Sequence, residues 1–330
     1  DVVVDRSAFT VPAADPAAFD GAALEPYNVQ PDAFLLNFNS VALVFSPDAA
    51  QHQVAITTEP PLPSGMVPTS LPLGDGDCTS WLQQLQHGTE QTGQLQVPSQ
   101  PYPQSCRNKT WRSAWPQPQQ FTHVALQGMW QQLGGSWQGK VRNGSIPAAL
   151  KAQKPLAELE SSSLSEVVHG INKFSNNVMA RQVFLSLSLA QQGQGSLPAS
   201  RQILQQWWQR RIPNSTPPTV DNGAGLSRQA RVSASALGHL LWHMWQSPVL
   251  PQWLDSLPVY GVDGTLRRVQ SPAAGQAHLK TGTLNNANSL AGYVTDTQGR
   301  HYVLVALAQG EQAHRARQAM YTLVDWVAAH

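Results

Sequence analysis

The alternation of hydrophobic and polar residues near the start of the chain predicts strands. Residues 2–9 read as one strand, and residues 35–45 and 53–58 alternate as the two strands of a hairpin. The next stretch, residues 59–113, is rich in proline and glutamine and lacks the periodic apolar positions that build a core. We therefore expect a mostly β region here.

A periodicity typical of helices begins in the middle of the chain. Ser163 and Glu166 have the spacing of a capping box, and apolar residues follow at helical intervals up to Ile171. A second helix is expected to begin near Asn176 or Asn177, which places Ser175 at the joint between two helices. Further helices are predicted over residues 123–133, 200–210, 233–245 and 311–328, and further strands over residues 137–141, 289–296 and 301–308.

Composition excludes several classes of function. The net charge is +1 and charged residues make up 12% of the chain, so no basic field is available to attract nucleic acid. No stretch approaches the ~18 consecutive apolar residues of a transmembrane helix, although peripheral association with a membrane stays open. No metal or cofactor is expected, because His239 and His243 lack the glutamate of a zinc-peptidase motif.

The chain has two cysteines, Cys78 and Cys106, within the proline- and glutamine-rich stretch. A disulfide between them would close a loop of about thirty residues and stabilise it by roughly 3 kcal/mol. Two free thiols are the alternative. A bridge in such a region favours an oxidising compartment, so we expect the periplasm or the cell exterior.

Two short motifs carry the candidate chemistry. Lys280-Thr281-Gly282-Thr283 precedes a predicted hairpin, and Ser175-Asn176-Asn177 lies about a hundred residues earlier at the start of a helix. In one group of acyl-transfer enzymes a Lys-Thr-Gly strand holds a substrate carboxylate beside a nucleophilic serine, and a Ser-x-Asn motif accompanies it. On its own, the Lys-Thr-Gly motif is more simply interpreted as a strand-end turn, and the Ser-x-Asn motif as a helix cap. Together they favour catalysis.

Five segments, in order, resemble those of a known family. They are residues 2–9, 173–177, 221–228, 259–266 and 280–284. The chain resembles the S13 peptidases, which are serine D-alanyl-D-alanine carboxypeptidase/endopeptidases of the class C low-molecular-mass penicillin-binding protein type. The resemblance implies the penicillin-recognising DD-peptidase/β-lactamase-like transpeptidase fold, an α/β fold, with an inserted mostly β subdomain.

The same resemblance predicts the domain organisation. Residues 1–30 would be a strand and linker leading from the N-terminal part of the catalytic domain. Residues 31–145 would form the inserted, mostly β region with the cysteine loop, and residues 146–330 the C-terminal part of the catalytic domain.

The sequence departs from the family pattern in one serious respect. The family's nucleophile belongs to a Ser-x-x-Lys motif that precedes the segment resembling residues 2–9, and the 330 residues contain no Ser-x-x-Lys. We therefore expect a fragment or a processed chain that lacks acyl-transfer activity as it stands. Ala224 is a smaller departure, since the family commonly has serine there.

The resemblance implies a role for each residue of the two motifs. Ser175 would pass a proton toward the leaving nitrogen, and Asn177 would hydrogen-bond the backbone of the acyl donor. Lys280 would lower the proton affinity of the Ser175 hydroxyl and attract the substrate carboxylate. Thr281 and Thr283 would bind that carboxylate through their hydroxyls, and Gly282 would let the substrate backbone approach the strand. The Thr283 N–H would supply half of the oxyanion hole.

Substrate recognition is implied in the same way. Asp20 and Arg228 would line a pocket for a diaminopimelate side chain, whose amine and carboxylate call for an anion and a cation. Leu284 and Asn285 would form the neighbouring wall. Solvated surface charges are the alternative for Asp20 and Arg228.

The predicted function is therefore that of an exported bacterial peptidoglycan D,D-peptidase that uses a serine acyl-enzyme. Its expected partners are peptidoglycan stem peptides and β-lactam antibiotics. Two alternatives stay open: a serine β-lactamase or esterase of the same fold, and a non-catalytic peptidoglycan-binding protein. The absence of the Ser-x-x-Lys motif motivates the second.

Overall fold

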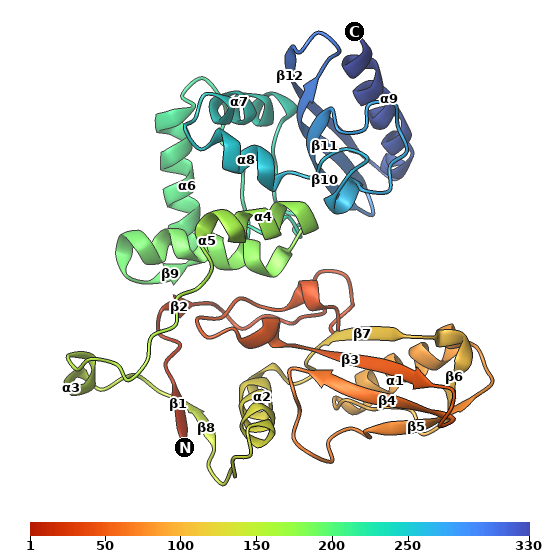
Figure 1. The fold of residues 1–330 in the computed structure, drawn as a ribbon. Coiled ribbons are helices and arrows are strands. Elements are labelled where there is room, and N and C mark those ends of the chain that lie inside the picture. Colours follow the sequence, from red (N-terminus) through yellow and green to blue (C-terminus); the bar gives the residue numbers. More distant parts are fainter. The chain divides into compact units, whose positions relative to one another are not determined.

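A computed structural model describes all 330 residues, which form two compact units, Asp1–Lys154 and Pro155–His330 (Figure 1). The first unit is built mainly on strands. Its elements are β1 (Val2–Val4), β2 (Phe9–Thr10), β3 (Ser40–Asp48), β4 (Gln53–Glu59), β5 (Ser70–Gly74), α1 (Cys78–Thr92), β6 (Tyr102–Pro103), β7 (Lys109–Ala114), α2 (Pro118–Gln132), β8 (Val141–Asn143) and α3 (Ala148–Lys151).

The core of the first unit lies against a five-stranded sheet of order β6-β5-β4-β3-β7. β3 and β4 form the predicted hairpin, with Phe45 opposite Ile56. Every second residue of β3 is buried in the main core cluster, because successive side chains of a strand point to opposite faces. These residues are Val41, Leu43 and Phe45.

The segment between the cysteines packs more fully than its composition predicts. It contains helix α1, which begins with Asp77 accepting a hydrogen bond from the Ser80 backbone, whereas the sequence pattern predicts no helix there. Trp81 and Leu85, one helical turn apart, are buried in the core. The ring of Trp81 lies 5.4 Å from that of Phe45 on the sheet. The prediction of little packing is therefore wrong, because a narrow apolar stripe between glutamines is enough to attach a helix to a sheet.

The predicted disulfide is confirmed: Cys78 and Cys106 are bonded across 28 residues. It joins the first residue of α1 to the end of a short 3-10 helix, Gln104–Cys106, that precedes β7. The bridge therefore holds the helix to the sheet that it covers.

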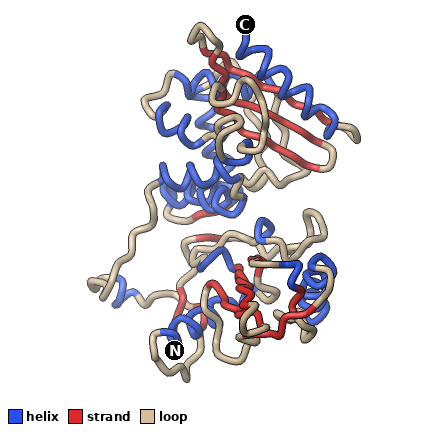
Figure 2. Tube along the Cα trace, turned by 45° about the vertical axis from the view of Figure 1, so that its right-hand side comes forward, coloured by secondary structure: helices blue, strands red, loops and turns tan.

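The second unit combines a helical region with an antiparallel sheet. Its elements are α4 (Leu164–Phe174), α5 (Asn177–Gln192), β9 (Gly195–Ser196), α6 (Leu197–Arg211), α7 (Ala234–Trp245), α8 (Leu250–Ser256), β10 (Ala277–Leu284), β11 (Ala287–Thr295), β12 (His301–Gln309) and α9 (Ala316–Ala329). The predicted capping box is present at the start of α4, where Ser163 and Glu166 exchange hydrogen bonds. Figure 2 shows the strands of this unit flanked by helices.

The sheet of the second unit has order β10-β11-β12 and is covered on both faces. On one face Leu279 and Leu290 pack with Met320 and Val324 of α9. On the other face Tyr293 packs with residues of α7 and α8, and its hydroxyl donates to the Leu241 carbonyl at 2.7 Å. The alternation along β10 therefore decides which residues face α9 and which face the helical region.

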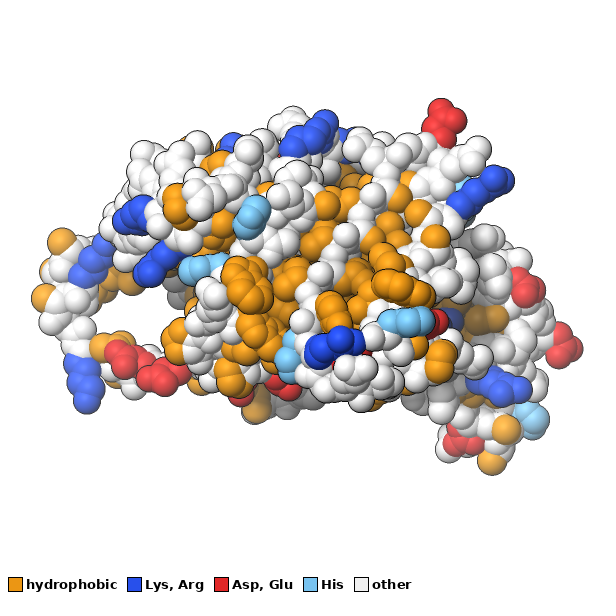
Figure 3. Space-filling model, turned by 90° about the horizontal axis from the view of Figure 1, so that it is seen from above, with side chains coloured by type: hydrophobic (Ala, Val, Ile, Leu, Met, Phe, Trp, Pro, Cys, Tyr) orange, Lys and Arg blue, Asp and Glu red, His pale blue; other side chains and the backbone are white.

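Part of the apolar surface of the second unit is exposed. Trp242, Tyr302 and Leu307 are each more than a third exposed, and hydrophobic side chains gather over a broad area in the view from above (Figure 3). Exposed apolar area of this kind is typical of contact surfaces. No helix of the structure combines the length and the apolar character that crossing a bilayer requires.

Candidate active site

Ser175 is the single residue that links α4 to α5. It ends α4 in the left-handed conformation, with φ 56° and ψ 45°, and Asn176 begins α5 by accepting a hydrogen bond from the Met179 backbone. A left-handed non-glycine residue costs about 1–2 kcal/mol, and such residues are concentrated at functional sites. The turn removes the Ser175 side chain from the hydrogen-bonding pattern of either helix.

Lys280 of β10 reaches this serine across 105 positions of sequence. Its ammonium donates to Ser175 Oγ at 2.5 Å and to the Thr281 carbonyl at 3.0 Å. The predicted proximity of Ser175 and Lys280 is therefore confirmed. Ser175 by itself resembles a helix cap, and Lys280 by itself resembles a solvated lysine, but the fold places them in direct contact.

The electrostatic state of Lys280 follows from its burial. Burial lowers the pKa of the Lys280 ammonium to about 8, because removal from water disfavours the charged form. No carboxylate forms an ion pair with it anywhere in the chain. The charge is therefore available to polarise the Ser175 hydroxyl and to attract an anion.

Gly282 has a steric reason to be glycine. It lies opposite Ser289 on β11, and a Cβ at this position would come within 2.4 Å of Ser289 Oγ. The Ser289 hydroxyl donates to the Gly282 carbonyl at 3.3 Å. A side chain here would therefore move the Ser289 hydroxyl and break its hydrogen bond to the Gly282 carbonyl.

Asn177 connects the start of α5 to a neighbouring loop. Its Nδ2 donates to the Ala224 carbonyl at 2.8 Å. Asn222 shapes that loop by accepting from the Ala224 backbone at 2.9 Å and donating to the Leu226 carbonyl at 3.0 Å. The loop is therefore held against the helix that follows Ser175.

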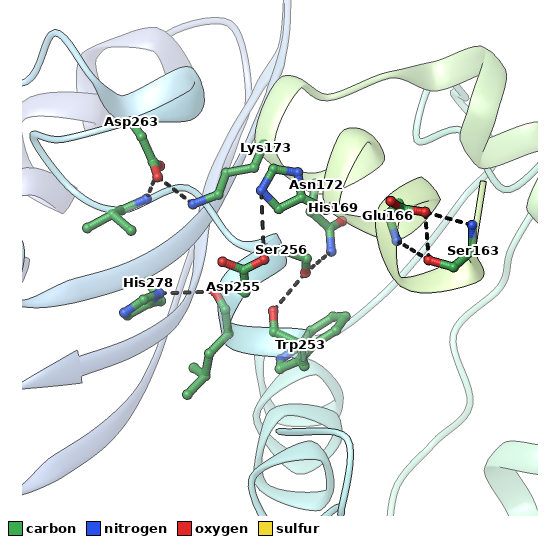
Figure 4. A network of polar contacts seen from close by, with 12 residues as sticks. Ser163, Glu166, His169, Asn172, Lys173, Trp253, Asp255, Ser256, Asp263 and His278 are labelled. Atoms are coloured by element: carbon green, nitrogen blue, oxygen red, sulfur yellow. Dashed lines mark hydrogen bonds and ion pairs between the residues drawn. The ribbon is translucent and has the colours of Figure 1, made fainter. Parts of the chain in front are cut away.

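An ion pair between a buried lysine and a partly exposed aspartate begins two residues before Ser175, and the sequence motifs did not point to it as functional. Lys173 is 5% exposed, and its Nζ lies 2.6 Å from Asp263 Oδ2 (Figure 4). Asp263 also accepts from the Val259 backbone at 2.7 Å. Two residues later, Thr265 Oγ1 lies 3.3 Å from Thr281 Oγ1. The ion pair therefore connects α4, which ends at Ser175, to the loop that contains Asp263 and Thr265. That loop in turn contacts Thr281 on β10.

The same side of α4 makes further polar contacts, as Figure 4 shows. Asn172 donates to Ser256 Oγ at 2.9 Å, and Ser256 in turn donates to the Trp253 carbonyl at 2.7 Å. His278 of β10 contacts the Leu254 carbonyl at 3.1 Å. Helix α8 therefore contacts both the helix and the strand that form the site.

The residues predicted to bind substrate lie in several places. Asp20 belongs to the first unit, where its carboxylate accepts hydrogen bonds from the Tyr27 hydroxyl and Asn28 Nδ2, both at 2.8 Å. Burial opposes the charge of Asp20, but these hydrogen bonds outweigh burial and its pKa is lowered. Arg228 ends the loop that contacts Asn177, and its carbonyl accepts from Arg231 at 2.9 Å.

Leu284 and Asn285 lie at the turn from β10 to β11, where Leu284 pairs with Ala287. They follow directly on the strand that carries Lys280. Their role as a substrate wall stays a prediction, as do the roles of Asp20 and Arg228.

Comparison with known proteins identifies the family. A model of the D-Ala-D-Ala carboxypeptidase 3 (S13) family matches residues 1–330. The chain belongs to this S13 family. The resemblance noted in the five sequence motifs is therefore confirmed.

Curated relatives of this S13 chain include bacterial carboxypeptidases. The D-alanyl-D-alanine carboxypeptidase of Actinomadura sp. (strain R39) is 32% identical over 173 residues, which cover 50% of this chain and 32% of the relative. Carboxypeptidase DacB of Mycolicibacterium smegmatis is 32% identical over 173 residues, covering 47% and 35%. The matched part thus spans about a third of the length of these relatives.

Solved structures confirm the fold. Penicillin binding protein 4 (dacB) from Haemophilus influenzae matches with a TM-score of 0.64 and 17% identity, covering 93% of this chain and 70% of that chain. A second structure of that protein, complexed with a novel β-lactam, matches with a TM-score of 0.62 and 17% identity, covering 91% and 71%. The predicted α/β fold of penicillin-binding proteins is therefore the fold of this S13 chain.

Proposed function

We propose that this S13 chain is part of a peptidoglycan D-alanyl-D-alanine peptidase that works through a serine acyl-enzyme and is acylated by β-lactams. The observation that carries the proposal is the contact between Lys280 Nζ and Ser175 Oγ, with no carboxylate paired to the lysine. A cation that only stabilises structure is usually paired when it is buried. An unpaired, partly buried ammonium beside a hydroxyl is suited to proton transfer and anion binding.

In this mechanism the nucleophile is the serine of a Ser-x-x-Lys segment outside residues 1–330. Its oxygen bonds to the carbonyl carbon of the penultimate D-alanine, and the C–N bond to the terminal D-alanine breaks. The hydroxyl proton of the nucleophile passes to the lysine of its own Ser-x-x-Lys segment. Ser175 delivers a proton to the leaving nitrogen and regains one from that lysine, and the Lys280 charge eases the loss of the proton from Ser175. Water then cleaves the ester and restores the serine.

Backbone and amide groups near the two motifs have supporting roles in the proposal. The Thr283 N–H would donate to the carbonyl oxygen as negative charge develops there, and the nucleophile's own N–H would be the second donor. Asn177 would bind the acyl donor from the start of α5. Its hydrogen bond to the Ala224 carbonyl holds its side chain in one orientation.

Roles in substrate recognition for two charged residues, each considered separately, are part of the same proposal. The Asp20 carboxylate suits an amine, and the Arg228 guanidinium suits the carboxylate of a diaminopimelate side chain. Arg228→Ala should weaken turnover of a peptide that carries this side chain by roughly 1.5–3 kcal/mol, the range of a charged hydrogen bond, and leave a β-lactam without it nearly unaffected. Equal losses on both substrates would assign Arg228 to the architecture of the site.

The disulfide and the membership of a cell-wall peptidase family support a periplasmic location. Peptidoglycan stem peptides and β-lactam antibiotics are the proposed partners. The location can be checked by fractionating cells that express the protein from its full coding sequence.

Labelled penicillin tests the proposed function. The product of the full coding sequence should form a covalent adduct with a fluorescent penicillin, and Ser175→Ala and Lys280→Ala should slow its formation. Absence of any adduct would favour a non-catalytic peptidoglycan-binding protein. An adduct that hydrolyses within seconds would favour a β-lactamase, because a D,D-peptidase retains its β-lactam acyl group far longer.

A further inference from the structure

A loop between α6 and α7 carries the hydrogen-bond partner of Asn177. The backbones of Thr219 and Arg231 exchange hydrogen bonds at 2.8 and 2.9 Å, and these bonds close the segment between them into a loop, the bridged loop. The Ala224 carbonyl in this loop accepts the hydrogen bond from Asn177 Nδ2, and the loop also contains Arg228. Two residues proposed to meet the substrate therefore depend on where the bridged loop lies.

The Ala224 carbonyl determines how the Asn177 amide is oriented. An asparagine amide has a donor end and an acceptor end, which a half turn of the amide exchanges. A carbonyl oxygen only accepts hydrogen bonds, so the 2.8 Å bond selects the orientation in which Asn177 Nδ2 points to Ala224. The second Nδ2 hydrogen and Oδ1 then have defined directions. Displacement of the Ala224 carbonyl would free the amide to rotate.

The backbone around Ala224 has little conformational restraint of its own. Gly223 and Gly225 flank it, both in the left-handed region with φ 78° and 79°, and glycine has more conformational freedom than any other residue. Asn222 restrains the turn from within the loop by accepting from the Ala224 backbone. A contact with a rigid element outside the loop is therefore needed to hold the Ala224 carbonyl against α5.

Arg201 of α6 provides such a contact at the start of the bridged loop. Its Nε donates to the Asp221 carbonyl at 2.6 Å, and its Nη2 donates to Asp221 Oδ1 at 2.9 Å. One guanidinium thus holds both the backbone and the side chain of a single loop residue, which the fixed, planar arrangement of arginine donors allows. Asp221 directly precedes Asn222, the residue that shapes the turn around Ala224.

A second arginine interacts with the same carboxylate from α5. Arg181 is 6% exposed. Burial lowers the pKa of the Arg181 guanidinium, and the Asp221 charge opposes this shift. Asp221 therefore interacts with cations on two helices, α5, which begins at Asn177, and α6, which precedes the loop.

We propose that Arg201 is a positioning residue of the active site: through Asp221 it fixes the bridged loop, and the loop fixes the orientation of the Asn177 amide. The inference rests on the proposed function, because that function gives Asn177 its contact with the acyl donor. It assigns a role to a residue of α6 that lies outside the contact between Ser175 and Lys280.

NMR of the 330-residue chain follows the orientation of the Asn177 amide without requiring catalysis. Arg201→Ala should change the chemical shifts of the Asn177 side-chain amide, because the amide loses its fixed acceptor. Arg210→Ala is the matched control, since Arg210 is an exposed arginine on the same helix whose Nε donates to the Gln206 carbonyl. It should leave the Asn177 signal unchanged. An Asn177 signal that does not respond to Arg201→Ala would overturn the proposal.

Two β-lactams separate positioning from a general loss of structure in the product of the full coding sequence. Benzylpenicillin carries an acylamino group that corresponds to the backbone Asn177 is proposed to bind, whereas 6-aminopenicillanic acid lacks it. Arg201→Ala should slow acylation by benzylpenicillin about tenfold, the effect of losing one strong hydrogen bond, and acylation by 6-aminopenicillanic acid by less than about twofold. Equal slowing with the two compounds, or slowing with neither, would contradict the positioning role.

Further variants test whether Arg201 acts through Asn177. In an Asn177→Ala background, Arg201→Ala should cause no further selective loss with benzylpenicillin, and a further selective loss would contradict the proposal. Asp221→Asn keeps the bond from Arg201 Nε to the backbone carbonyl, so it should lose less selectivity than Arg201→Ala. The side chains of Arg201 and Asp221 are 41% and 27% exposed. A partly exposed ion pair contributes little to global stability, so both variants should fold.

The two proposals fail in different ways. If the Asn177 signal responds to Arg201→Ala but penicillin never acylates the full product, the positioning contact stands and the peptidase function falls. If penicillin acylates the full product but neither the Asn177 signal nor the selectivity changes, the function stands and the positioning role falls.

Discussion

The ion pair between Lys173 and Asp263 makes a sharp prediction about stability. The Lys173 side chain is 6% exposed, whereas the Asp263 side chain is 41% exposed. Removal of the carboxylate charge therefore leaves a largely buried ammonium without its charge partner. Removal of the ammonium leaves a carboxylate that water still solvates and that keeps its hydrogen bond from the Val259 backbone. We expect the two single substitutions to differ in cost.

The expected magnitudes follow from this asymmetry. Breaking a buried pair by removing one partner costs about 3–5 kcal/mol when an uncompensated buried charge remains. Asp263→Asn should lower the free energy of unfolding of the second unit by about 3 kcal/mol, near the lower limit because the asparagine keeps a polar contact. Lys173→Met should cost about 1–2 kcal/mol, since methionine fills the space and leaves no buried charge. The double variant should be more stable than Asp263→Asn alone.

Urea unfolding followed by hydrogen exchange measures these differences locally. Peptides from α4 and from residues 257–266 should lose protection in Asp263→Asn, while the first unit should be unchanged. A cost for Lys173→Met equal to or greater than that for Asp263→Asn would refute the reasoning, because it would mean that the Lys173 charge is not isolated by burial.

The pH dependence gives an independent check. Burial opposes the charge of Asp263, but the hydrogen bond from Lys173 and its neighbours prevail, so the pKa of Asp263 is lowered. A depressed carboxyl pKa contributes stability above the unfolded-state value of about 3.9, and this stability is lost as the pH falls through the folded-state value. Asp263→Asn should remove this part of the acid sensitivity.

Three further predictions concern the strand, the lysine and the disulfide. Lys280→Ala should slow β-lactam acylation of the full product on the order of a hundredfold. In the parent protein the acylation rate should fall as the pH rises through about 8, where Lys280 loses its charge. An acylation rate that stays constant up to about pH 9.5 would contradict this role of Lys280. Gly282→Ala should slow acylation because its Cβ meets Ser289 Oγ, and adding Ser289→Ala should recover part of the rate if the clash is the cause. Reduction of the Cys78–Cys106 bridge should destabilise the first unit by about 3 kcal/mol, measured by urea unfolding with and without reductant, and an unchanged midpoint would exclude that contribution.

Local sequence signals predicted the second unit well because local interactions form its elements. The capping box at Ser163 and the helical spacing after it define the start of α4 without any distant partner. Strands β11 and β12 follow from alternation and a turn. In the first unit the same approach missed α1, because few apolar residues mark its buried side among many glutamines, Trp81 and Leu85 being the fully buried ones.

The sequence by itself determined the family, the starts of α4 and α5, the alternation of β11 and β12, and the identity of the motif residues. Only the tertiary structure brought Lys280 to Ser175 and paired Lys173 with Asp263. The physical reason is that caps and periodicities depend on residues within a few positions of one another. Burial and charge pairing depend on which distant segments the fold places in contact, and here those segments are about 90 and 105 positions apart.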